Sequence, residues 1–195
     1  VNPAAVAVTF VGAANANANT TSHRVVVPAA VQAGDTLVLH MSLNTAAVTL
    51  GDPAGWTVLD SLTAGGVQGR SWTRTATAAD AGSTVTITTS GLAKGDLSLG
   101  AYRASGGGST AVVAHAGSVD QATGATHTAP TVNVAAPGAW VLTYWAAKAS
   151  VDIAWATPAG SVLRTSAPGS GGGRLASGQR GLWRQWRRPA LSHSR

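Results

Sequence analysis

Apolar and polar residues alternate with a period of two in one segment of this chain after another. The clearest case runs from Asp35 to Leu43, where every second residue is apolar. This alternation is expected of a β-strand that buries one face, because successive side chains of a strand point to opposite sides. The face expected to be buried comprises Leu37, Leu39, Met41 and Leu43, and the opposite face Thr36, Val38, His40 and Ser42.

Three further segments predict strands. Val85 and Ile87 alternate with threonines in residues 83–89, and threonine is favoured on an exposed pleated surface. Residues 131–134 repeat the pattern over a shorter stretch. The run from Trp140 to Trp145 is apolar on both faces, which predicts a strand in the middle of a sheet.

Turn residues separate these runs at short intervals. Asp52-Pro53-Ala54-Gly55 has proline and glycine where a type I turn favours them, and Ala136-Pro137-Gly138-Ala139 suits a type II turn. We find no amphipathic helical pattern of ten residues or more. Many short strands without a βαβ rhythm predict an all-β fold, an antiparallel two-sheet β-sandwich of the jelly-roll or immunoglobulin-like kind.

Charge is distributed unevenly along the 195 residues. The formal net charge is +6, yet residues 1–173 hold seven basic and seven acidic side chains, so the whole excess lies after residue 173. A neutral body does not favour nucleic acid as a partner. No apolar run is long enough for a membrane-spanning helix. Because the chain starts at Val1 and has no cysteine, we expect a processed protein with neither disulfide nor thiolate metal site.

Several of these motifs together resemble a known family. VxxGDTLVLHMSLN, GWTVLD, RSWTRTATAADAGSTVTITTS, LSLGAYRA, THTAPTVNV and WVLTYWAAKA resemble, in this order, a β-sandwich module of large secreted or cell-surface proteins of high-GC bacteria. The resemblance covers residues 5–177. It implies a non-catalytic accessory or adhesion domain, often beside PKD, lectin-like or kelch-type domains, and a secreted or cell-surface location.

The end of the chain, GQRGLWRQWRRPALSHSR, departs from this pattern. We therefore expect a sandwich domain over residues 1–177 and an irregular basic tail over residues 178–195. Three interpretations stay open: an arm for nucleic acid or membrane, an ordinary disordered terminus, and a segment read out of frame. Arginine and tryptophan are enriched when GC-rich coding DNA is read out of frame, which favours the third.

Catalytic and metal-binding patterns are missing from the sequence. The seven acidic residues are all aspartates, scattered singly and mostly in turns, and no nucleophile elbow, zinc-protease or phosphate-loop motif occurs. We therefore expect no enzyme and no cofactor. The histidines lack the spacing of a transition-metal site, while calcium on loop aspartates and carbonyls stays open without assignable ligands.

Aromatic residues supply the remaining candidates. Trp72 and Trp155 are the tryptophans we expect to be exposed, as platforms for a sugar ring, and Arg70 and Arg74, which flank Trp72, are expected to bind the ligand with them. Trp56, Trp140 and Trp145 are expected in the core, and Asn15, Asn17 and Asn19 in a solvated loop. The sequence thus favours a surface-binding or adhesion module for a polysaccharide or cell-surface glycan. A spacer between neighbouring domains and a virion or tail-associated sandwich are the alternatives.

Overall fold

The structure is a computed structural model and describes residues 7–107, 110–121, 127–134, 138–149, 156, 159–167 and 174–182. Its described residues form strands and one short 3₁₀ turn, Ser105–Gly107 (η1), and include no α-helix. The all-β prediction is confirmed. The strands are β1 (Val8–Val26), β2 (Thr36–Leu43), β3 (Thr57–Ala64), β4 (Val67–Thr75), β5 (Thr84–Ala104), β6 (Val141–Ala149), β7 (Ser161–Ala167) and β8 (Arg174–Leu182).

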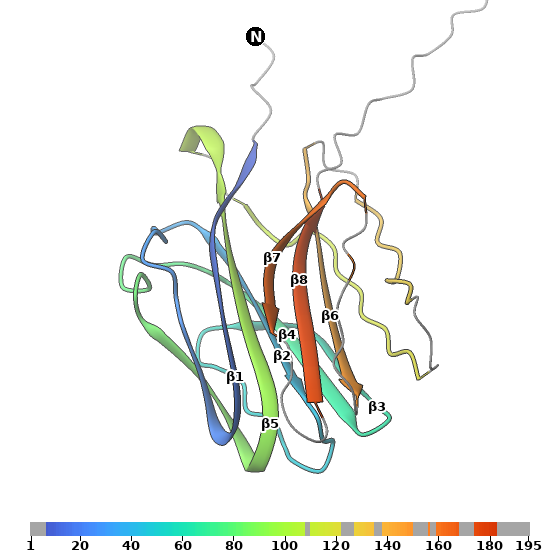
Figure 1. Cartoon of the computed structure of the whole chain (residues 1–195). Coiled ribbons are helices and arrows are strands. Elements are labelled where there is room, and N and C mark those ends of the chain that lie inside the picture. Colours follow the sequence, from blue (N-terminus) through green and yellow to red (C-terminus); the bar gives the residue numbers. More distant parts are fainter. Residues whose placement is uncertain are drawn as a thin grey trace, which may run out of the picture.

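An antiparallel sheet of five strands, in the order β1-β5-β2-β4-β3, is the centre of the molecule (Figure 1). Strand β2 lies in its middle, between β5 and β4, and is buried along almost its whole length. Glycines with positive φ turn the chain before β2 at Gly34, φ 91°, and before β5 at Gly82, φ 71°. Glycine adopts this left-handed conformation without steric cost, which suits it to both turns.

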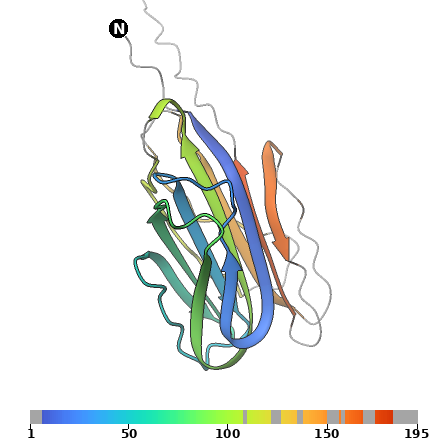
Figure 2. The same cartoon turned by 90° about the vertical axis from the view of Figure 1, so that its left-hand side faces the viewer.

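The apolar core lies on one face of this sheet. Strands β1 and β5 stay paired from Val8 opposite Ala104 to Val26 opposite Thr84, and they bend together where the register shifts between Thr20 and Ser22. Their far halves thus fold back over the sheet, as Figure 2 shows. The folded-back halves contribute Val25, Val85 and Ile87 to the core, which they share with Leu37, Leu39, Met41, Leu43, Trp72, Leu97 and Leu99.

A second antiparallel sheet, in the order β6-β8-β7, lies on the opposite face of the five-stranded sheet (Figure 2). This half of the chain differs from three expectations. Strand β6, predicted to be central, is an edge strand with half-buried side chains. Residues 131–134 form no strand. Strand β8 passes the boundary expected at residue 177 and ends at Leu182, so the irregular course expected from Gly178 is wrong for 178–182.

Strand β8 forms although its sequence has no alternating apolar pattern, because it lies between two other strands. It pairs with β6 on one side and with β7 on the other, so both edges of its backbone are hydrogen-bonded. Residues 183–195, which hold the rest of the predicted tail, lie outside the described residues.

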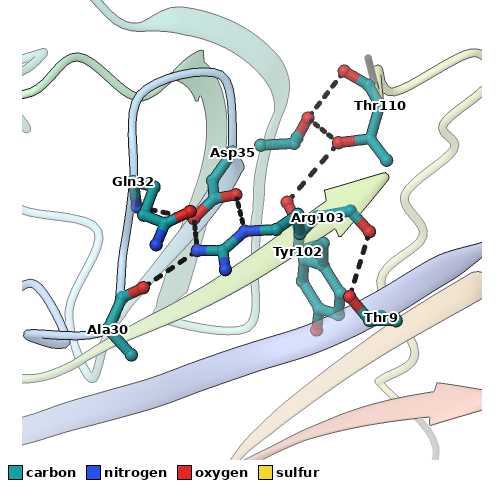
Figure 3. Close-up of polar contacts among 8 residues, drawn as sticks. Thr9, Ala30, Gln32, Asp35, Tyr102, Arg103 and Thr110 are labelled. Carbon is teal, nitrogen blue, oxygen red and sulfur yellow. Dashed lines mark hydrogen bonds and ion pairs between the residues drawn. The ribbon is translucent and has the colours of Figure 1, made fainter. Parts of the chain in front are cut away.

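An ion pair ties the end of β5 to the turn before β2 (Figure 3). Arg103 donates from Nε and Nη2 to the two carboxylate oxygens of Asp35, both at 2.7 Å, and from Nη2 to the carbonyl of Ala30 at 2.9 Å. The backbone N–H of Gln32 also donates to Asp35, at 2.8 Å. Burial raises the pKa of Asp35, but these hydrogen bonds outweigh it and hold the pKa below its usual value.

Candidate functional site

The tryptophan expected to be an exposed sugar platform is buried. Trp72 on β4 is 0% exposed and lies opposite Leu39 in the apolar core. Its indole Nε1 donates to Asp52 Oδ1 at 2.8 Å, which is the main cause that lowers the pKa of that carboxyl. The expectation is wrong although Arg70 and Arg74 lie on the same face of β4 as Trp72, because their guanidinium groups reach out to aspartates while the indole between them packs in the core. Trp155 lies outside the described residues.

The two arginines beside Trp72 are engaged in ion pairs. Arg70 donates to Asp52 at 2.8 Å and to the carbonyl of Leu50 at 3.1 Å. Arg74 donates from Nη2 to both carboxylate oxygens of Asp80, at 2.6 and 2.8 Å. Both arginines thus hold loops next to β4. Through these contacts Arg70 and Arg74 stabilise the fold. The contacts do not support the ligand-binding role predicted for the two arginines.

The face opposite the core carries polar residues in rows across the five-stranded sheet. We call this the polar face and define it by two rows. In the first row, strand pairing places Asn15, Ser98, His40, Ser71 and Asp60 side by side across β1, β5, β2, β4 and β3. In the second row, the neighbours are Asn17, Asp96 and Ser42.

The middle of the polar face is buried under strand β6. The ring of Tyr144 stacks on the ring of His40 with centroids 4.5 Å apart and planes 3° apart. The hydroxyl of Tyr144 shares a hydrogen bond of 2.9 Å with Ser42 and donates to Asp96 at 3.4 Å. Ser98 also donates to Asp96, at 2.8 Å. Two hydroxyl groups therefore donate to one oxygen, Oδ2, of a carboxyl group that is 0% exposed.

Burial changes the acid–base behaviour of two histidines. Burial alone lowers the pKa of His40 to about 4. His23, on the folded-back half of β1, is buried among apolar side chains, and this burial lowers its pKa, although a hydrogen bond with the Thr20 backbone opposes the shift. The neutral form of both rings is favoured because a charge is poorly solvated in these places.

The asparagines expected in a loop lie on strand β1. Asn15, Asn17 and Asn19 are exposed, point to the polar face and pair with β5 at Ser98, Asp96 and Lys94. Asn15 donates from Nδ2 to the carbonyl of Ser166 on β7, at 3.1 Å. Amide groups about 7 Å apart, the distance of two residues along a strand, thus form a ladder at the margin of the polar face.

Aromatic side chains surround an arginine where β7 passes β1. Arg164 lies 4.2 Å above the ring of Phe10 and 5.8 Å from that of Trp140. Tyr102 contacts both rings, with centroids 5.8 Å from Phe10 and 6.2 Å from Trp140. Trp140 is half-buried, not fully buried as expected, and these cation–π contacts attach the two sheets to each other.

The aspartates of the described residues make structural contacts. Asp35, Asp52 and Asp80 pair with arginines, while Asp60 and Asp120 contact His115 at 3.2 Å and His127 at 2.9 Å. Within the described ranges, histidine and acidic side chains form no group of three or more that could hold a metal ion. Nor does this part of the chain contain a helix long and apolar enough to cross a membrane.

Sequence reasoning found β2 and part of β5, but it placed the asparagines of β1 in a loop and did not find the polar face itself. Alternation along β2 places His40 and Ser42 on one side, and alternation around Asn15 would have done the same for β1. The rows become visible only with the pairing between strands distant in sequence. Comparison with known proteins adds no relative: no family model, no curated protein and no solved structure matches this chain.

Proposed function

We propose that this protein is a non-catalytic β-sandwich module of a secreted or cell-surface protein, and that it binds an extended polar ligand, a polysaccharide or surface glycan. The polar face carries the proposal. Hydroxyl, amide and imidazole groups line this face in rows, so it offers a surface of hydrogen-bond donors and acceptors. A face that is only in contact with water does not need its polar side chains arranged in rows.

The accessible part of this face is its margin on β1. Asn15, Asn17 and Asn19 are exposed there, and an amide both donates and accepts hydrogen bonds, as the hydroxyls of a sugar do. The half-buried ring of Trp140 lies close to the same strand, through Phe10 and Arg164. An aromatic body beside polar groups suits the apolar side of a pyranose.

Three parts of the proposal rest on separate grounds. The sandwich arrangement is supported by the contacts of Tyr144 and Arg164 with the five-stranded sheet. The non-catalytic role is supported by the aspartates, whose contacts hold turns and loops in place. Secretion is supported by the resemblance over residues 5–177 alone.

Retention by immobilised polysaccharides tests the proposal. We expect native affinity electrophoresis against a panel of neutral and acidic polysaccharides to find at least one that retards the protein. The double variant Asn15→Ala/Asn19→Ala should lose this retardation with little change in melting temperature. The control Thr84→Ala/Thr88→Ala removes two exposed polar side chains from the folded-back half of β5 and should be retarded like the wild type. If no polysaccharide retards the wild type, the protein is better described as a spacer.

A further inference from the structure

The outer edge of strand β1 points to a second copy of this chain. Strand β1 is the edge of the five-stranded sheet, and no other strand of the described residues pairs with its outer side. An edge strand offers backbone N–H and C=O groups to any strand that comes alongside. Natural edge strands usually prevent this with charges, prolines or bulges.

Strand β1 has none of these protections over a long stretch. From Val8 to Ser22 it contains no charged residue and no proline. Its register with β5 is uninterrupted from Gly12 to Thr20, and the two irregularities lie just outside, after Phe10 and before Ser22. The unprotected stretch is therefore regular enough to continue the sheet.

The sequence of this stretch is symmetric about Asn17. An antiparallel pair of identical strands with Asn17 on the two-fold axis places Asn15 opposite Asn19, and Ala16 opposite Ala18. Further out, Ala14 meets Thr20, and Gly12 meets Ser22. Small residues thus meet small residues and amides meet amides, which is the self-complementarity that a two-fold interface requires.

We propose that two copies of this protein associate through their β1 strands, antiparallel and centred on Asn17, so that the two five-stranded sheets become one continuous sheet. Residues directly opposite in an antiparallel pair lie on the same face. The asparagines of both copies therefore form one amide strip, and asparagine ladders of this kind add to the stability of strand pairs.

Cysteine cross-linking tests the register, because the wild-type chain has no cysteine. In Asn17→Cys the two introduced thiols face each other, with Cα atoms about 4.5–5.5 Å apart, which suits a disulfide. In the matched control Asn19→Cys the two Cα atoms lie about 14 Å apart along the strand, four residues out of register. We expect mild oxidation to convert Asn17→Cys to a dimer at least about tenfold more completely than Asn19→Cys, since Cα atoms more than about 7 Å apart cannot be bridged.

A charge variant tests the same interface without a new bond. Ala18 is exposed, so Ala18→Lys should fold normally while it brings two ammonium groups close together at the interface. Sedimentation should show self-association of the wild type that rises with concentration and is lost in Ala18→Lys. The proposal is overturned if Asn17→Cys and Asn19→Cys cross-link equally, or if Asn17→Cys, shown by circular dichroism to be folded, stays monomeric under oxidation.

Discussion

The two faces of strand β2 are both covered, but they are held by different interactions. On one face Leu37, Leu39, Met41 and Leu43 are all 0% exposed and pack in the apolar core. On the other, His40 and Ser42 lie beneath Tyr144 and depend on stacking and hydrogen bonds. Apolar contacts gain free energy from any close packing, whereas a buried polar group costs free energy unless its partner is in place. The core should therefore dominate stability, and the polar face should be sensitive to pH and to the loss of single atoms.

The largest effect is expected in the core. Leu39→Ala removes a fully buried side chain next to Trp72 and should lower the free energy of unfolding by about 2–5 kcal/mol. Urea unfolding followed by tryptophan fluorescence measures the change. A loss no larger than that of the polar-face variants would show that the two faces do not differ as we describe.

The second effect concerns pH and separates the faces directly. The folded protein keeps His40 neutral down to a pH of about 4, whereas in the unfolded chain the pKa returns to about 6.5. As the pH falls through this window the unfolded chain binds the proton first, so His40 alone should reduce stability by up to about 3 kcal/mol at pH 4.

Urea midpoints at pH 7.5, 5.5 and 4.5 measure this slope, and His40→Phe, which retains a ring against Tyr144, should flatten it. His23 contributes in the same direction, so part of the slope should persist. The pKa values of Asp35, Asp52 and Asp80 lie below their usual range, so their contributions are lost only at still lower pH. An unchanged slope in His40→Phe would contradict the assignment to His40.

A smaller effect is expected from a single hydroxyl of the polar face. Ser98→Ala removes the donor that lies 2.8 Å from Asp96 Oδ2 and should cost about 1–3 kcal/mol, because a buried oxygen loses a partner. Thermal unfolding at pH 7.5 measures the cost. Thr84→Ala, an exposed site on the folded-back half of β5, serves as the control and should change stability little.

The smallest effect should appear in the covering sheet. Tyr144→Phe retains the ring on His40 but removes the hydroxyl that contacts Ser42 and Asp96, at a cost of about 1 kcal/mol. Hydrogen exchange should become faster in β6 and stay unchanged in β4. Faster exchange in both strands would instead indicate that the two sheets unfold as one unit.

The contrast between the faces also explains what the sequence could and could not predict. Alternation around Leu39 and around Ile87 depends only on the strand itself, and both predicted apolar faces are buried in the structure. Trp72 was misplaced because its exposure depends on the shared core, to which segments far away in the sequence contribute, such as Val85 and Ile87 on the folded-back half of β5. Strand β8 was missed at 178–182 because its neighbours β6 and β7, and not its own pattern, make it a strand.

The polar face was beyond sequence reasoning for the same kind of reason. Each row crosses strands far apart in the chain, from Asn15 through His40 to Ser98. A single strand shows which residues share a side, but only the register shows which residues of different strands meet. The candidate site could therefore be recognised only after the strand order was known.

The long pairing of β1 with β5 has a consequence for the order in which the protein folds. Strand β1 is synthesised before the other strands. Its partner β5 ends at Ala104, and this last residue is the one that lies opposite Val8 at the start of β1. Contacts between residues so distant in sequence form slowly, because a large loop must close before they gain any stability. A newly made chain therefore carries the uncharged stretch around Asn17 without a partner until β5 has been synthesised. In this interval β1 of one chain could pair with β1 of another, so a chaperone that holds extended segments should raise the yield of correctly folded protein.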